Sequence, residues 1–150
     1  MAHRERKLRV GVVGVGLQGR VHLSCLRALR EVEVTATADL DLGRAEAAAA
    51  EFGVPRWYAS HEEMLAEAPL DAVTVATPDD AHLAPCQAAA AAGKHLLVEK
   101  PLATSVAEGE AIVAAARDAI GSDSWLMVDA GASDAFWGNG FKWALRTAHM

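Results

Sequence analysis

The stretch V-G-V-V-G-V-G-L-Q-G-R, residues Val10 to Arg20, decides how the rest of the chain is interpreted. An apolar run that starts at Leu8 leads into glycines at positions 14, 16 and 19, and a helical pattern follows at once. In such a strand–turn–helix unit Gly14 makes the tight turn, Gly16 lets the backbone approach a pyrophosphate, and Gly19 lets the helix pack close to its strand. The helix N-terminus adds N–H donors and partial positive charge. We therefore expect this turn to bind the phosphates of a nucleotide.

Strand and helix patterns alternate along the chain. Apolar and β-branched runs predict strands at residues 8–13, 32–38, 56–59, 71–76, 95–98 and 125–128. Helical spacing predicts helices from residue 17 and at 41–52, 61–68, 80–92 and 106–120, two of them opened by the capping boxes Ser60–Glu63 and Ser105–Glu108. This alternation with short connections predicts an α/β fold, a doubly wound parallel sheet with helices on both faces.

The apolar spacing also predicts which helix faces pack against the sheet. On the first helix these positions are Leu17, Val21, Ser24, Cys25, Ala28 and Leu29, and on the last helix Val106, Gly109, Val113, Ala116 and Ile120. Cys25 and Cys86 form no C-x-x-C pattern and are interpreted as small buried hydrophobes.

The composition excludes several classes of protein. The 150 residues are 52% hydrophobic and 23% charged, which suits one domain with a sizeable core. The net charge of −6 argues against a nucleic-acid surface, which needs a basic stripe. No apolar run approaches the roughly 20 residues that span a bilayer, and the basic N-terminus lacks a signal-peptide pattern. The two isolated cysteines fit a reduced, cytoplasmic compartment. The six histidines show no metal-ligand spacing, so we expect no metal.

A carboxylate follows the second expected strand. Asp39 lies 20 residues beyond Gly19, where it could accept hydrogen bonds from both hydroxyls of an adenosine ribose. A plain turn aspartate is the weaker alternative, given the glycines before it. The same carboxylate would repel a 2′-phosphate, so the sequence favours NAD over NADP. Arg44 is an opposing feature, because its side chain could turn toward such a phosphate.

Polar residues follow four different expected strands: the glycine turn, Asp39, Thr77-Pro78 and Glu99-Lys100. The carboxyl ends of parallel strands share one edge of the sheet, and ligands bind at that edge. We therefore expect these residues to meet in one crevice.

Lys100 is our candidate for chemistry near a nicotinamide. The following Pro101 favours an extended conformation at Lys100, and its ammonium could bond a substrate hydroxyl, although a surface lysine is the common alternative. His82 could face the same crevice, and a solvated histidine at a helix start is an equal alternative. We assign no role in the site to the other histidines, His3, His22, His61, His95 and His149.

Four segments together resemble the Gfo/Idh/MocA oxidoreductase family. They are G-V-V-G-V-G-L-Q-G (11–19), A-D-L-D (38–41), A-T-P-D-D-A-H (76–82) and A-G-K-H-L-L-V-E-K-P-L-A (92–103), of which the E-K-P motif is the most specific. The resemblance runs from about Leu8 to Val128. It implies a Rossmann fold that binds NAD(P) and serves the oxidation of sugars, inositols or similar polyols. It also implies that Lys100 belongs to the catalytic site, and the residues it places at the cofactor are Gly14, Val15, Gly16, Leu17, Gln18, Gly19, Asp39, Thr77, Pro78, His82, Glu99 and Lys100.

The family also carries a second α/β domain, which supplies the substrate pocket and usually an Asp/His pair for proton transfer. This chain ends where that domain would begin, so we expect a dinucleotide-binding domain at 1–128 and a divergent, aromatic-rich tail at 129–150. Alcohol oxidation needs a proton acceptor near neutrality, and Lys100 could serve only where burial disfavours its charged form. We therefore expect NAD binding without appreciable turnover by this chain alone, and action on a polyol or sugar only with a second domain.

Two alternatives remain open at this point. The first is a non-enzymatic module that binds nucleotide or a partner, including a second copy of itself, through the aromatic tail; a catalytically silent yeast repressor resembles the same family. The second is another oxidoreductase branch with the same first domain, such as a biliverdin-reductase-like enzyme.

Overall fold

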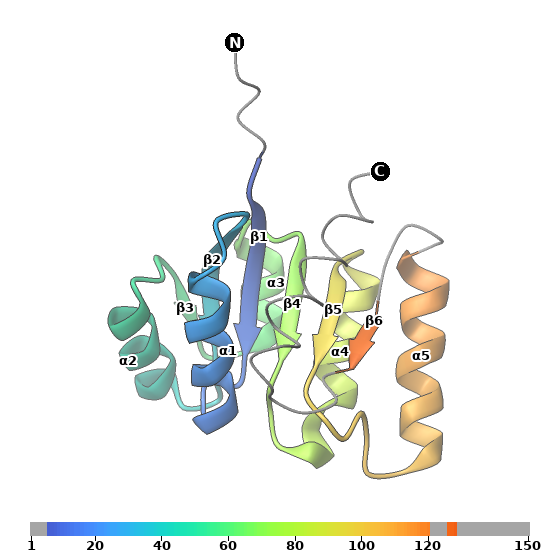
Figure 1. The fold of residues 1–150 in the computed structure, drawn as a ribbon. Coiled ribbons are helices and arrows are strands. Elements are labelled where there is room, and N and C mark those ends of the chain that lie inside the picture. Colours follow the sequence, from blue (N-terminus) through green and yellow to red (C-terminus); the bar gives the residue numbers. More distant parts are fainter. Residues whose placement is uncertain (1–5, 121–125, 129–150) are drawn as a thin grey trace.

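The computed structural model describes residues 6–120 and 126–128. The strands are β1 (Leu8–Val13), β2 (Val32–Ala38), β3 (Trp57–Tyr58), β4 (Ala72–Val75), β5 (His95–Val98) and β6 (Leu126–Val128). They form one sheet in the order β3-β2-β1-β4-β5-β6, and every neighbouring pair is parallel. All the carboxyl ends therefore lie along one edge, the lower edge in Figure 1. The predicted doubly wound parallel sheet is confirmed.

Helices cover both faces of this sheet (Figure 1). They are α1 (Leu17–Arg27), α2 (Leu42–Phe52), α3 (His61–Glu67), α4 (Leu83–Ala91) and α5 (Val106–Ile120), with a short 3-10 turn, η1 (Asp79–Ala81), before α4. The two core clusters separate by face: α1 and α2 contribute to one, and α3, α4 and α5 to the other. The chain changes face between β1 and its neighbour β4, which is the switch point where ligands bind in sheets of this kind.

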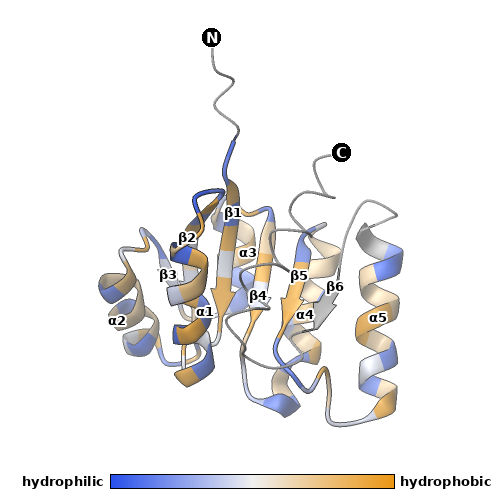
Figure 2. Ribbon diagram, in the orientation of Figure 1, coloured by the Kyte–Doolittle hydropathy of each residue, from blue (hydrophilic) through white to orange (hydrophobic). Residues whose placement is uncertain are grey.

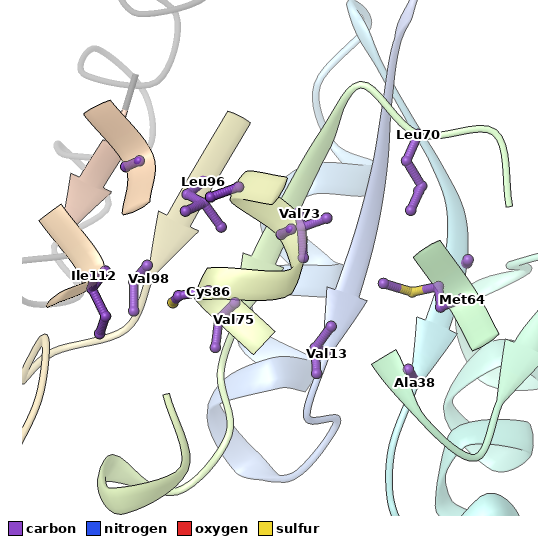
Figure 3. Packing of buried hydrophobic residues seen from close by; sticks show 14 residues of the cluster. Val13, Ala38, Met64, Leu70, Val73, Val75, Cys86, Leu96, Val98 and Ile112 are labelled. Atoms are coloured by element: carbon purple, nitrogen blue, oxygen red, sulfur yellow. The ribbon is translucent and has the colours of Figure 1, made fainter. Parts of the chain in front are cut away.

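The central strands are buried on both sides and are almost continuously apolar, as Figure 2 shows by their colour. On β1, Val10 and Val12 pack under α1 and α2, whereas Val13 joins the cluster on the opposite face. That second cluster includes Cys86 and Ile112 (Figure 3). Such double burial is typical of parallel sheets whose faces are both covered by helices.

Side-chain caps begin the helices where the sequence predicted them. Ser60 Oγ accepts a hydrogen bond from the N–H of Glu63 at 3.2 Å, and Ser105 Oγ accepts one from Glu108 at the same distance. Both contacts satisfy an N–H group that the first turn of a helix leaves without a backbone acceptor. The two predicted capping positions are therefore confirmed.

Several boundaries differ from the prediction. The third strand is confined to Trp57 and Tyr58 instead of residues 56–59. The helix expected at 80–92 is divided, because Ala81 N–H bonds the Pro78 carbonyl in a 3-10 turn and α4 begins only at Leu83. A tight i to i+3 turn of this kind is common where a helix starts.

The predicted inner faces of α1 and α5 are only partly right: Cys25 of α1 and Leu29, just after it, pack against one core cluster, and Ala116 of α5 is buried in the other. On α1, Leu17 is 82% exposed and the buried side chains are those of His22, Leu23 and Leu26. On α5, Ile112 is fully buried and Val106 is 78% exposed. This alanine-rich helix has a weak apolar stripe, so its packing against α4 decides which side faces inward.

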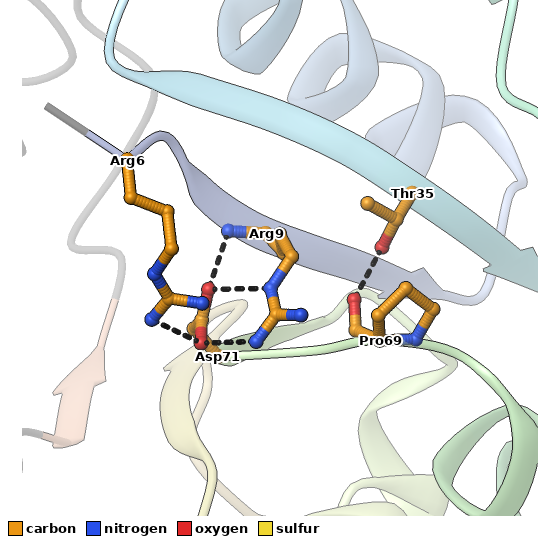
Figure 4. Close-up of polar contacts among 5 residues, drawn as sticks. All are labelled: Arg6, Arg9, Thr35, Pro69 and Asp71. Atoms are coloured by element: carbon orange, nitrogen blue, oxygen red, sulfur yellow. Dashed lines mark hydrogen bonds and ion pairs between the residues drawn. The ribbon is translucent and has the colours of Figure 1, made fainter. Parts of the chain in front are cut away.

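An ion-pair cluster closes the amino edge of the sheet, opposite the carboxyl ends (Figure 4). Asp71, just before β4, accepts hydrogen bonds from the Arg9 N–H at 2.9 Å and from the Arg9 guanidinium at 2.9 and 3.0 Å. Arg6 donates a further bond at 3.1 Å. Since Arg9 lies on β1, these contacts hold the starts of the two central strands together.

The predicted aromatic-rich tail at 129–150 lies outside the described residues. Among the helices that the structure does describe, none is both long and apolar enough to cross a bilayer.

Candidate functional site

A cavity of about 360 Å³ opens at the carboxyl edge of the sheet, at the switch point between β1 and β4. Its walls come from the loops that follow β1, β2, β4 and β5. Twelve residues line it: Gly14, Gly16, Leu17, Gln18, Asp39, Arg44, Ala76, Thr77, Pro78, Asp79, Glu99 and Lys100. The structure thus brings together residues from four separate parts of the sequence, as the strand-end rule predicts.

The three glycines of the turn, Gly14, Gly16 and Gly19, differ in how much space an added Cβ atom would have. Gly14 has φ of +82°, and an added Cβ would lie 2.6 Å from the Ala76 carbonyl oxygen. At Gly19 the Cβ would lie 1.9 Å from the Gly14 carbonyl oxygen, so α1 can approach the turn only with glycine there. At Gly16, by contrast, a Cβ would meet no atom within 4 Å. Packing within the described part of the protein therefore explains glycine at 14 and 19, and leaves open space beside Gly16.

Asp39 joins the end of β2 to the glycine turn. Its Oδ2 accepts a hydrogen bond from the Val15 N–H at 3.1 Å, and its Oδ1 accepts one from the Asp41 N–H at 2.9 Å. The Val15 side chain is fully buried, so this residue reaches the site only through its backbone. An ionised carboxylate has about four acceptor positions, and Asp39 therefore keeps capacity for a diol.

A cation lies beside this carboxylate. Arg44 Nη1 is 3.6 Å from Asp39 Oδ1, and the other guanidinium nitrogen, Nη2, is 3.7 Å from Asp41 Oδ2. Half of the Arg44 side chain is exposed, and it lines the cavity. Asp79 and Ala76 also line the cavity and were not predicted; their sequence signal was their position beside Thr77-Pro78.

Glu99 is a largely buried residue of the cavity wall whose carboxylate contacts three other residues. Its Oε1 lies 3.0 Å from His22 Nε2 and accepts a hydrogen bond from Gln18 Nε2 at 3.3 Å. Its Oε2 accepts the backbone N–H of Lys100 at 3.1 Å. His22, which is 1% exposed, is the residue that sequence reasoning missed. A signal existed: Gln18 and His22 are four apart on α1 and so share one face of that helix.

His82 is also buried, and it does not line the cavity. Its Nε2 lies 3.0 Å from the Thr77 carbonyl oxygen, and its Nδ1 lies 3.2 Å from that of Leu102. His82 therefore links the loop that carries Thr77 to the loop that carries Leu102, on the side away from the cavity. Its predicted contact with a cofactor stays a prediction. Lys100 is exposed at the cavity, and the Lys100–Pro101 peptide bond is cis.

With this geometry in view, comparison with known proteins identifies the family. The Gfo/Idh/MocA profile, described as an oxidoreductase family with an NAD-binding Rossmann fold, matches residues 8–121. This chain belongs to that family. The resemblance drawn from the sequence motifs is confirmed.

Relatives within the family include enzymes that act on inositols and sugars. Inositol 2-dehydrogenase 1 of Saccharopolyspora erythraea is 42% identical over 109 residues, which are 71% of this chain and 32% of that protein. D-xylose 1-dehydrogenase (NADP(+)) 2 of Haloferax volcanii is 38% identical over 112 residues, 73% of this chain and 33% of that protein. This chain thus spans about a third of the length of these curated relatives.

A solved structure of a dehydrogenase has a similar fold. The WlbA dehydrogenase from Bordetella pertussis, in complex with NADH and UDP-GlcNAcA, is 32% identical and matches with a TM-score of 0.76. The match covers 83% of this chain and 37% of that one.

Proposed function

We propose that this chain binds NAD in the cavity at the carboxyl edge of the sheet, as the dinucleotide-binding part of a dehydrogenase that oxidises a polyol or sugar. The observation that carries the proposal is the open space beside Gly16, at the start of α1 and on the cavity wall. No atom of the described protein requires glycine there, whereas a pyrophosphate lying against the backbone would.

The lining residues fit the parts of a dinucleotide. The N–H groups at the start of α1 suit the pyrophosphate, and the Asp39 carboxylate suits the hydroxyls of the adenosine ribose. Thr77, Glu99 and Lys100 also line the cavity, and we assign them to its nicotinamide end. A bound nicotinamide would supply the hydride acceptor, and the exposed ammonium of Lys100 would donate a hydrogen bond to the substrate hydroxyl or to the ribose.

We propose NAD rather than NADP as the preferred cofactor. Asp39 is largely buried and presents a negative charge at the position of the 2′ oxygen, where a phosphate would be repelled. Arg44 lies close enough to reduce this repulsion, so the expected preference is moderate.

We further propose that residues 1–150 alone bind NAD without appreciable turnover. Removal of the hydroxyl proton needs a base near neutral pH. Lys100 is exposed, and the Glu99 carboxylate is already engaged by His22, Gln18 and the Lys100 N–H. The match covers only 32% of inositol 2-dehydrogenase 1, so about two thirds of that protein has no counterpart among the matched residues.

Calorimetric titration with NAD tests the binding proposal. The wild type should bind, and Gly16→Ala should bind at least about tenfold more weakly, because its methyl group would occupy space needed by the pyrophosphate. Gly109→Ala is the matched control: its Cβ would make only ordinary contacts at 3.9 Å, in a helix that does not line the cavity. The absence of NAD and NADP binding to the wild type at millimolar ligand would refute the proposal. Turnover of inositols or aldoses by this chain would refute the proposal that residues 1–150 bind NAD without appreciable turnover.

A further inference from the structure

Two buried histidines contact the segment that carries Lys100, one on each side of it in the sequence. His22 from α1 contacts Glu99, the residue before Lys100, and His82 from the start of α4 contacts Leu102, two residues after it. Each histidine is 1% exposed. Lys100 itself is exposed and lines the cavity. The buried histidines therefore contact the residues on either side of it, and its own side chain stays accessible.

The contact from His22, together with the longer one from Gln18, orients the Glu99 carboxylate. One carboxylate oxygen lies 3.0 Å from the His22 ring, and the other accepts the Lys100 N–H at 3.1 Å. Since Glu99 is only 5% exposed, water cannot easily replace either partner. Loss of the His22 contact would leave only the longer Gln18 bond, at 3.3 Å, on that oxygen, so the carboxylate that accepts the Lys100 N–H would be held less firmly.

The contact through His82 holds the other end of the segment. Its two ring nitrogens lie within 3.2 Å of the carbonyl oxygens of Leu102 and Thr77. The same ring therefore ties the Lys100 loop to the loop after β4, and both loops line the cavity.

We propose that His22 and His82 are positioning residues that set the place of Lys100 against the cofactor, a role that rests on the proposed function. Neither lines the cavity, and both act through the 99–102 segment. Cofactor affinity should therefore depend on two histidines that the described cavity does not expose.

A ligand-free measurement tests the positioning directly. Selective ¹⁵N-lysine labelling gives amide signals for four lysines, Lys7, Lys94, Lys100 and Lys142, and Lys100→Arg assigns the relevant one. In His22→Leu the Lys100 amide should change its chemical shift and exchange with solvent about tenfold faster, because its charged acceptor, Glu99, is held less firmly. The Lys7 amide, at the amino edge of the sheet, should not change. His22→Gln, which keeps a donor near the Nε2 position, should restore most of the wild-type signal.

A second measurement links this segment to the cofactor. At a temperature where all variants are folded, NADH affinity measured by fluorescence should fall about tenfold in His22→Leu and in His82→Leu, and less in His22→Gln. If wild-type affinity is measurable and neither leucine variant changes it or the Lys100 amide, the inference is overturned. If the wild type does not bind NADH, the proposed function fails, and the ligand-free measurement still decides the positioning of Lys100. If His22→Leu does not fold, His22→Asn, whose shorter side chain keeps its polarity but cannot span the distance to Glu99, tests the same contact.

Discussion

Asp39 has two tasks within one side chain. It accepts the N–H groups of Val15 and Asp41, which shapes the turn, and it lines the cavity where a ribose would lie. The nearby Arg44 guanidinium, 3.6 Å away, partly balances its charge. We therefore expect the cofactor preference of this site to depend on the balance between the Asp39 carboxylate and the Arg44 guanidinium.

Asp39→Ala should weaken NAD binding by about tenfold or more, because a charged acceptor for the ribose is lost. NADP binding should weaken less or improve, since the repulsion of its phosphate disappears while Arg44 remains. Adding Arg44→Ala should then weaken NADP more than NAD. Parallel titrations with both cofactors measure the ratio, and an unchanged ratio in Asp39→Ala would contradict this assignment.

At the scale of elements, the site depends on how closely α1 approaches the end of β1. The histidine and glutamine that engage Glu99 are carried by this helix, and Gly19 sets its distance from the turn. If α1 moved outward, Gln18 and His22 would be separated from Glu99, and the glycine turn proposed to bind the pyrophosphate would be distorted.

Gly19→Ala should lower the free energy of unfolding by about 1 to 3 kcal/mol, because the new methyl group overlaps the Gly14 carbonyl oxygen. Gly109→Ala, in the helix α5, should be neutral or stabilising by up to about 1 kcal/mol, as expected for removing a helical glycine. Urea unfolding of both variants measures the difference. Equal stability of the two variants would show that α1 does not make the close approach described.

At the scale of the whole molecule, the two edges of the sheet have different tasks. The carboxyl edge holds the cavity, and the amino edge holds the cluster of Arg6, Arg9 and Asp71 (Figure 4). Burial alone would raise the pKa of Asp71, but hydrogen bonds from Arg9 and the charges of Arg9 and Arg6 outweigh it and hold the pKa well below its ordinary value. This cluster stabilises the fold without touching the site.

A lowered pKa in the folded state means that Asp71 stabilises the fold fully above its ordinary value of 3.8 and loses this effect as the pH falls further. Asp71→Asn should therefore cost about 1 to 2 kcal/mol at neutral pH, and a smaller amount near about pH 3. Urea unfolding at the two pH values tests this, with the exposed Asp80→Asn as the control. A cost that stays constant with pH would contradict the role of the charge. NAD affinity at neutral pH should not change.

Much of the fold could be predicted from local patterns. The bounds of β1, β2 and β5 follow directly from apolar and β-branched runs, and the caps of α3 and α5 follow from Ser-x-x-Glu spacing. These features depend on neighbours a few residues away, so a single segment contains the information. The same holds for the glycine turn and for the residues that end each strand, because parallel strands must share one carboxyl edge.

The chain alone therefore specified the sheet, its ligand-binding edge and most of the residues that line the cavity. Only the folded structure decided which polar residues are buried and with whom. His22 reaches Glu99 across 77 positions of sequence, and Arg9 reaches Asp71 across 62. A buried histidine is stable only where a partner replaces water, and that partner belongs to another element whose position follows from packing rather than from local spacing.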